Sequence, residues 1–283
     1  MRYFRRSEQG FTLVELVITI VLLGVLAIAT ADFIRSGALI FRRGADQQQL
    51  VGEARFAIAR INRDLVNALP NSALVTDLAG NRAQPGQGGP CLTFVPTQSS
   101  GSYIDLPISP SSTSSFTIVR SFDDSSSANI AVYVLDSSEA ICDDGSGAPN
   151  SLCDGSGQKV QSVSSVAPVD DLPRDPDDAL RTVTLSAAGS FPAASPSQRY
   201  YFVGAPVRYC IRNNQLLRVA PASFNLDDDG VAISNQIDTQ RVSQFIVESP
   251  SLTRNGLINV RLSFLDADEY MEFNYDLSVA NQP

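Results

Sequence analysis

The sequence predicts an α+β protein, in which a long N-terminal α-helix packs on an antiparallel β-rich head that disulfides stabilise. The first observation is an apolar run of 21 residues from Phe11 to Ala31, long enough to cross a hydrocarbon core of ~30 Å as a helix. The second is helical spacing of apolar residues as far as Leu69, and the third is a change after it to short β-rich runs between Ser, Gly, Pro and Asp clusters. The expected parts are a leader (1–10), a transmembrane segment (11–31), an amphipathic segment (32–69) and the head (71–283).

The apolar run contains one carboxylate, Glu15, about one helical turn from its start. A carboxylate at membrane depth costs ~2.5–3.5 kcal/mol on insertion scales and less near a helix end, so this residue is a functional candidate. If the chain were cut after Gly10, the new amine of Phe11 would lie four residues from Glu15 on the same helix face. A cation and an anion would then be available to pair within one subunit or between subunits.

The segment Gly10–Leu16, which reads Gly-Phe-Thr-Leu-Val-Glu-Leu, resembles the processing site of type IV prepilins and type II secretion pseudopilins. In that family, a membrane-embedded prepilin peptidase cuts after the glycine and methylates the exposed phenylalanine nitrogen. The resemblance implies that Gly10 precedes the cut, that Phe11 is N-methylated, and that Glu15 is the carboxylate used in subunit assembly. It covers only about the first 30 residues of the chain.

Two other interpretations of the apolar run stay open at this point. It could be an ordinary signal anchor, or a secretory signal with Ala29–Ala31 as its small-residue cleavage site. The internal Glu15 and the length of the run count against a secretory signal.

The charges that flank the run predict its orientation. Arg2, Arg5 and Arg6 precede it, whereas Asp32 and Arg35 follow it. The positive-inside rule therefore leaves the leader in the cytoplasm. We expect a single-pass inner-membrane protein with a periplasmic head, which reaches the cell surface after assembly into a pilus.

Overall charge argues against a nucleic-acid partner. The 21 basic and 30 acidic residues become 18 and 29 when residues 1–10 are removed, a net charge of about −11. Binding to a phosphate backbone requires a basic surface.

The helical pattern continues beyond the membrane segment as one apolar stripe. Its members are Leu50, Ala54, Ile58, Ile61, Leu65 and Leu69. Pro70 and Asn71 then end the predicted helix. Glycines at 24, 37, 44 and 52 interrupt the pattern, so two helices separated near Ser36–Gly37 are an alternative.

Ten segments of the head are candidate strands. They are Cys91–Val95, Phe116–Arg120, Asn129–Leu135, Arg181–Leu185, Arg199–Val203, Val207–Ile211, Gln215–Val219, Val242–Val247, Leu257–Phe264 and Tyr270–Leu277. Asn213-Asn214 fits a hairpin turn, because asparagine tolerates positive φ. Four Ser-rich segments are expected as loops: Thr97–Ser102, Pro110–Ser115, Ser121–Ala128 and Ser137–Val166.

The four cysteines all lie in the segment expected outside the cytoplasm, where disulfides persist. Three pairings are possible. We favour Cys142–Cys153, which closes an Asp/Gly-rich loop, and Cys91–Cys210, which joins two predicted strands. The alternative is a zinc site, for which the spacing is poor and histidine is absent.

The composition predicts that the protein is not an enzyme. Without histidine, no Ser-His-Asp or Cys-His arrangement can form. The Asp pairs fall in polar segments, where solvated surface charge is their usual role. Cofactors are not expected, with one weak candidate for calcium in the segment Asn225–Gly230, where Asn225, Asp227 and Asp229 offer oxygen ligands at alternate positions. An ordinary Asp-Gly turn explains the same residues.

Three further short stretches are similar to the MshO-type minor pilins of the mannose-sensitive haemagglutinin (MSHA) pilus, which are related to J-type pseudopilins. They are Arg60–Leu65, Gly89–Phe94 and Arg208–Ile211. The resemblance implies a structural subunit of the complex that initiates a type IV pilus and stays at its tip, with a prepilin peptidase and other minor and major pilins as partners. A J-type pseudopilin of type II secretion and a tip adhesin are the alternatives.

Overall fold

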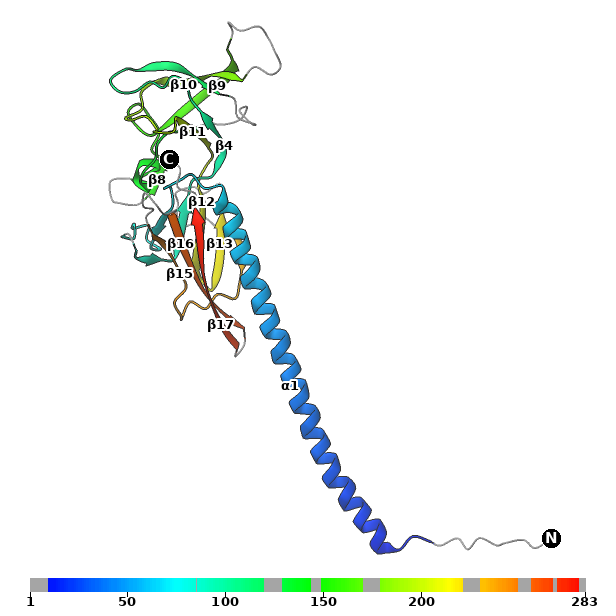
Figure 1. The fold of residues 1–283 in the computed structure, drawn as a ribbon. Helices are drawn as coiled ribbons and strands as arrows, with labels where there is room; N and C mark the ends of the chain where they lie inside the picture. The colour runs from blue at the N-terminus through cyan, green and yellow to red at the C-terminus, as the bar shows by residue number, and fades with distance from the viewer. Residues whose placement is uncertain are drawn as a thin grey trace, which may run out of the picture. The chain divides into compact units, whose positions relative to one another are not determined.

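The computed structural model describes residues 10–84, 86–119, 129–143, 149–169, 179–220, 230–248, 256–266 and 269–279. It confirms the predicted class: a long N-terminal helix is followed by an antiparallel β-rich head with two disulfides. The chain divides into two compact units, Met1–Gln49 and Leu50–Pro283, which are treated separately below (Figure 1).

Helix α1 extends over 54 residues, from Leu13 to Val66. The alternative of two helices separated near Ser36–Gly37 is not found, and α1 is continuous there. The helix ends three residues before the predicted Leu69 because the chain turns to join the sheets. The N–H of Ala68 donates to Leu65 O at 3.0 Å, and the N–H of Leu69 donates to Val95 O at 2.8 Å.

The first unit contains the apolar part of α1. Every described residue from Gly10 to Ala31 is exposed. The helix is long and apolar enough to cross a membrane by length and composition. An unburied apolar helix of this kind requires lipid or other helices around it.

The head is built from antiparallel strands in three sheets and one two-stranded ribbon. The first sheet has the order β1 (Leu74–Thr76), β3 (Cys91–Phe94), β12 (Val207–Arg212), β13 (Gln215–Val219) and β14 (Val231–Ser234). The second has the order β17 (Glu269–Val279), β16 (Gly256–Asp266), β15 (Gln244–Glu248) and β2 (Gly88–Gly89). Figure 1 shows strands of both sheets beside the second half of α1.

The third sheet lies beyond the C-terminal end of α1, where the N–H of Thr97 donates to Asn67 O at 2.6 Å (Figure 1). Its order is β4 (Thr97–Ser102), β11 (Arg199–Val203), β6 (Asn129–Ala131), β9 (Val160–Pro168), β10 (Leu180–Gly189) and β5 (Thr113–Val119). The short helix α2 (Ser137–Ala140) leads into the ribbon of β7 (Ile141–Asp143) and β8 (Pro149–Leu152).

The largest core cluster joins α1 to the first two sheets. Helix residues Leu50, Ala54, Ala57, Ile61 and Leu65 are completely buried in it. It also contains residues from β1, β3, β12, β13, β15, β16 and β17. This contact explains why the buried stripe begins at Leu50: from there on, the helix covers one side of the first two sheets. Two smaller clusters fill the third sheet and the region of the ribbon.

The ten candidate strands all overlap strands of the structure, with ends shifted by up to a few residues. The predicted turn is confirmed, since Asn213 and Asn214 have φ of 53° and 60° and connect β12 to β13.

Two of the expected loops are corrected. Thr97–Ser102 is strand β4, and Ser137–Val166 contains α2, β7, β8 and most of β9. The first was missed because β4 contains only Thr, Gln, Ser and Gly; its place depends on backbone pairing with β11. In Pro110–Ser115, residues from Thr113 belong to β5, and Ser121–Ala128 lies outside the described residues.

Candidate functional site: the processing junction and the anchored helix

The junction between Gly10 and Phe11 is extended and accessible. Gly10, Phe11 and Thr12 precede the first helical residue, and Phe11 is 78% exposed. A Cβ atom built on Gly10 would meet no atom within 4 Å. The conformation of this chain therefore leaves the peptide bond open to a peptidase, and any requirement for glycine there comes from outside the chain.

Thr12 caps the helix, and Glu15 occupies its first turn. The Oγ1 atom of Thr12 accepts a hydrogen bond from the N–H of Glu15 at 3.3 Å, as in a capping box. A carboxylate in the first turn is favoured by the partial positive charge of the helix N-terminus. Among the described residues, no basic side chain pairs with Glu15.

A second group of polar residues anchors α1 to the first sheet of the head. The hydroxyl of Tyr209 on β12 donates to Asp64 Oδ2 at 2.7 Å. The Nε of Arg218 on β13 donates to the same oxygen at 2.6 Å. Tyr209 and Arg218 are direct partners in the β12–β13 ladder, so two neighbouring strands hold one helix carboxylate.

Burial and the neighbouring charges alter the pKa values in this group. Burial, and then the hydrogen bond to Asp64, raise the pKa of Tyr209 above its usual value. Burial alone would lower the pKa of Arg218, but its contacts with Asp64 and Tyr209 outweigh it and the pKa is raised. Both shifts favour the protonated forms, so the tyrosine is held neutral and the guanidinium is held charged.

Glu53, which lies three helical turns before Asp64 on α1, makes a similar contact with the first sheet. Ser234 at the end of β14 donates its hydroxyl to Glu53 Oε2 at 2.7 Å. The side-chain amide of Gln236 donates to Glu53 Oε1 at 3.1 Å when its nitrogen faces the carboxylate. Glu53 and Asp64 are eleven residues apart, which is close to three helical turns. That spacing is the signal in the sequence that places both carboxylates on one helix face, and the sequence analysis did not use it.

Both favoured disulfides are present. Cys91 and Cys210 are direct cross-strand partners on β3 and β12, with Cα atoms 4.1 Å apart. Cys142 and Cys153 close the region around the ribbon. All four cysteines are thus in disulfides and are not zinc ligands. The calcium candidate Asn225, Asp227 and Asp229 lies outside the described residues.

The three short stretches Arg60–Leu65, Gly89–Phe94 and Arg208–Ile211 meet in space. Asp64, within Arg60–Leu65, is bonded to Tyr209, within Arg208–Ile211. Cys91, within Gly89–Phe94, is bonded to Cys210 of the same β12 stretch. These stretches therefore form one helix–sheet junction, although they are far apart in the sequence.

These features define a class of protein: a chain with an exposed membrane-length helix, an exposed Gly-Phe junction before it and a disulfide-bonded β head. Residues 5–31 match the family model described as the prokaryotic N-terminal methylation motif, over about a tenth of the chain. The match supports a type IV pilin-like or pseudopilin-like protein, and it implies processing by a prepilin peptidase and assembly with other pilins. It indicates a structural subunit rather than an enzyme. Neither a curated protein nor a solved structure matched the chain.

Proposed function

We propose that this chain is a minor pilin that is cut after Gly10, methylated on the nitrogen of Phe11 and assembled into a type IV pilus through α1. The observation that carries the proposal is the combination of an accessible Gly-Phe junction with a carboxylate in the first turn of an exposed apolar helix. Before assembly, α1 is held in the inner membrane with the head in the periplasm.

The assembly step follows from electrostatics. In lipid, Glu15 has no water to solvate its charge, and among the described residues no basic side chain pairs with it. The amine of Phe11 on an adjacent subunit supplies the opposite charge. Pairing relieves the desolvation cost of the carboxylate and sets the axial position of one helix against the next.

The large head supports a place in the initiating or tip complex of an MSHA-type pilus, as an MshO-type subunit. A head of about 210 residues with three sheets is a bulky unit to repeat along a filament. The three stretches that resemble MshO-type minor pilins also meet at one helix–sheet junction, which supports this assignment.

Deletion of the gene followed by counting of surface filaments tests the proposal. We expect few or no filaments, with full recovery on expression of the wild-type chain. Normal filaments together with blocked export of folded proteins would instead favour a J-type pseudopilin. Normal filaments that no longer attach to cells would favour a tip adhesin.

A further inference from the structure

Strand β17 ends the second sheet and has a paired strand on one side only. It pairs with β16 through eleven consecutive residue pairs without a bulge. In an antiparallel pair, every second residue of an end strand directs its N–H and C=O away from the sheet. Among the described residues, no hydrogen bond to these outward groups of β17 is found, so the strand presents an open edge.

The other sheet ends in the described part of the head are short or covered. Strand β1 has three residues, and the chain folds back on it through the pair Thr76 and Arg82. Strand β14 has four residues and β2 has two. In the third sheet, Tyr103, which follows β4, pairs with Ile118 of β5, so the two end strands meet. With its 11 residues, β17 is the one long end strand there without such cover.

The accessible part of the edge is Tyr270–Asp276. None of these seven residues is buried, whereas Val260, Leu262 and Phe264 on the paired stretch of β16 are completely buried. The contrast shows that the sheet is covered up to β16 and uncovered at β17.

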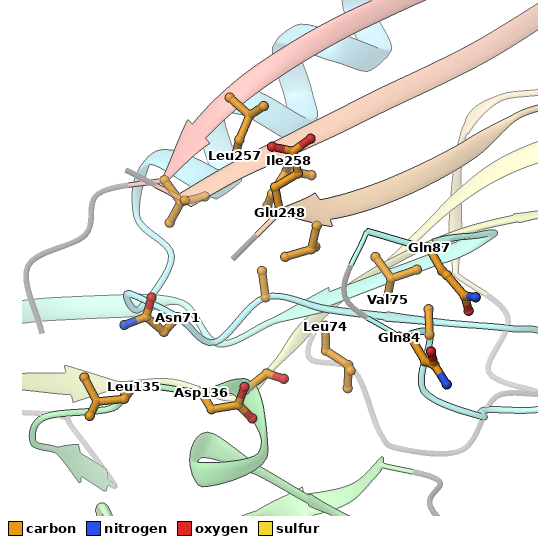
Figure 2. A pocket seen from close by; sticks show the side chains of 16 residues that line it. Asn71, Leu74, Val75, Gln84, Gln87, Leu135, Asp136, Glu248, Leu257 and Ile258 are labelled. Carbon is orange, nitrogen blue, oxygen red and sulfur yellow. The ribbon is translucent and has the colours of Figure 1, made fainter. Parts of the chain in front are cut away.

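The other end of β17 is covered. Val279 and Ile258 line a cavity of about 160 Å³, which β1 and the segment before α2 enclose from other sides (Figure 2). Figure 2 shows Glu248 and Asp136 on opposite walls of this cavity. Both carboxylates already interact within the chain, Asp136 as the cap of α2. The open edge is therefore confined to Tyr270–Asp276.

The core-facing side of this stretch is apolar and incompletely covered. Met271 and Phe273 are half-buried and pack against the core beneath α1. Tyr275 faces the same side, because side chains alternate along a strand. It is 42% exposed, although its partner Val260 is completely buried. A further strand beside β17 would cover these three side chains with its own alternate residues.

The opposite side of the stretch is polar. Glu272 is paired with Arg261, and Asp276 accepts from Asn259 at 2.7 Å. Both bonds run back to β16, so these carboxylates are not free ligands. They still disfavour an acidic side chain directly across the edge. The strand that fits this edge is apolar on one side and neutral or basic on the other.

A second copy of this chain fits the edge poorly. Antiparallel pairing of two β17 strands is two-fold symmetric, so it reverses one head relative to the other. Because β17 runs beside the second half of α1 (Figure 1), that arrangement would also reverse the helices, whereas subunits anchored in one membrane point the same way. In-register parallel pairing would set Glu272 beside Glu272.

We propose that Tyr270–Asp276 receives an extended segment of a different filament subunit as an added strand, whose alternate apolar side chains lie beside Met271, Phe273 and Tyr275. The inference rests on the proposed function for the class of the partner. Main-chain hydrogen bonds supply the attachment, and the apolar row sets the register. Strand β17 has no bulge, proline or lysine, the devices by which proteins block an open edge.

Amide hydrogen exchange tests the backbone contact directly. The full chain purified alone in detergent is compared with the full chain purified together with the other subunits of its filament system, and fragmentation mass spectrometry follows the amides of Tyr270–Asp276. In the chain alone, every second amide should exchange rapidly. In the complex, these amides should slow by about tenfold or more, the ratio that one net hydrogen bond gives. Unchanged exchange in the complex would overturn the proposal.

Variants of the apolar row make that result specific. Tyr275→Lys places a charge in the row and should remove the added protection, whereas Tyr275→Phe should keep it. The amides bonded to β16 should stay slow in both variants, which shows that the head is folded. Asn274→Lys, on the polar side of the same strand, is the matched control and should keep the protection. Equal effects of the two lysines would contradict the proposed contact.

Photo-crosslinking in cells identifies the partner. A p-benzoylphenylalanine at Tyr275 should link to a peptide of a different filament subunit that has apolar residues at alternate positions. Placed at Val231, 72% exposed on β14, it should not give this product. A link to a second copy of this chain, or to a peptide without the alternation, would overturn the proposal.

The two proposals can fail separately. If filament number is normal without this chain while Tyr275→Lys still removes the protection of the co-purified chain, the filament role fails and the added strand stands. If filaments are lost on deletion but the amides gain no protection in the complex, the added strand fails alone.

Discussion

Tyr209 and Asp64 are 145 positions apart in the sequence, and the tyrosine hydroxyl donates to the aspartate Oδ2 at 2.7 Å. The bond connects strand β12 to helix α1, and Arg218 reinforces it from β13. Because Tyr209 is fully buried and the side chain of Asp64 is only 14% exposed, the contact determines how the second half of α1 lies on the first sheet.

Removing the carboxylate from this contact should destabilise the head strongly. Asp64→Ala leaves a half-buried guanidinium and a buried hydroxyl without their acceptor, so we expect a loss of about 3 kcal/mol in the free energy of unfolding. Tyr209→Phe removes one hydrogen bond and should cost about 1 kcal/mol. Urea unfolding of the full chain in detergent, followed by near-ultraviolet circular dichroism, measures both. Glu272→Gln, at an exposed ion pair with Arg261, is the control, and an equal loss there would contradict this role of Asp64.

Alkaline pH should weaken the same contact. The pKa of Tyr209 is raised in the folded head, first by burial and then by Asp64, above the unfolded value of ~10. A raised folded pKa favours the protonated form, so its contribution is complete below pH ~10 and is lost as pH rises from there toward the folded pKa. We expect the free energy of unfolding to fall above pH ~10 by less in Tyr209→Phe than in the wild type. Parallel curves for the two proteins would exclude this assignment.

Glu15 should matter for assembly and not for insertion. Glu15→Ala removes a charge from the first turn of the membrane helix, so the chain should remain in the inner-membrane fraction while its incorporation into filaments falls. Immunoblots of membrane and sheared-filament fractions measure the two steps. Glu53→Gln, which alters the helix only in the head, should not change incorporation in this way. Unchanged incorporation of Glu15→Ala would count against the pairing with a neighbouring amine.

Gly10 should be required by the peptidase and not by the fold. Because a Cβ at this position meets open space, Gly10→Val should leave the folded head intact while the ten-residue leader is retained. Intact-mass measurement of the membrane protein distinguishes the two forms, and the wild type should carry one additional methyl group on Phe11. Removal of the leader from the variant at the wild-type rate would refute the assigned cleavage position.

The two disulfides should differ in how much they stabilise the head. Cys91–Cys210 closes a loop with a sequence separation of 119, worth about 5 kcal/mol on a chain-entropy estimate. Cys142–Cys153 has a separation of 11 and is worth about 3 kcal/mol on the same estimate. Paired Cys→Ser variants compared by thermal unfolding test the order. A larger loss from the Cys142/Cys153 pair would show that the loop-length argument does not apply here.

Local sequence patterns predicted the parts of the fold that depend on residues close together in the sequence. The apolar run and the stripe that includes Leu50 to Leu65 predicted α1, and short β-rich runs predicted ten strands. The Asn213-Asn214 turn was also found, because its positive φ values favour asparagine. Strand β4 was missed because it has no apolar residue, so only its pairing with β11 makes it a strand.

The sequence by itself determined the N-terminal methylation motif, the membrane-length apolar helix and the acidic residue within it, because each is a feature of contiguous residues whose chemistry needs no distant partner. The tertiary structure alone decided which residues meet across the chain. It brought Asp64 to Tyr209 and Arg218, Glu53 to Ser234, and Asp136 to one cavity with Glu248. Such contacts depend on the registers of several sheets at once, and no local period in the sequence encodes them.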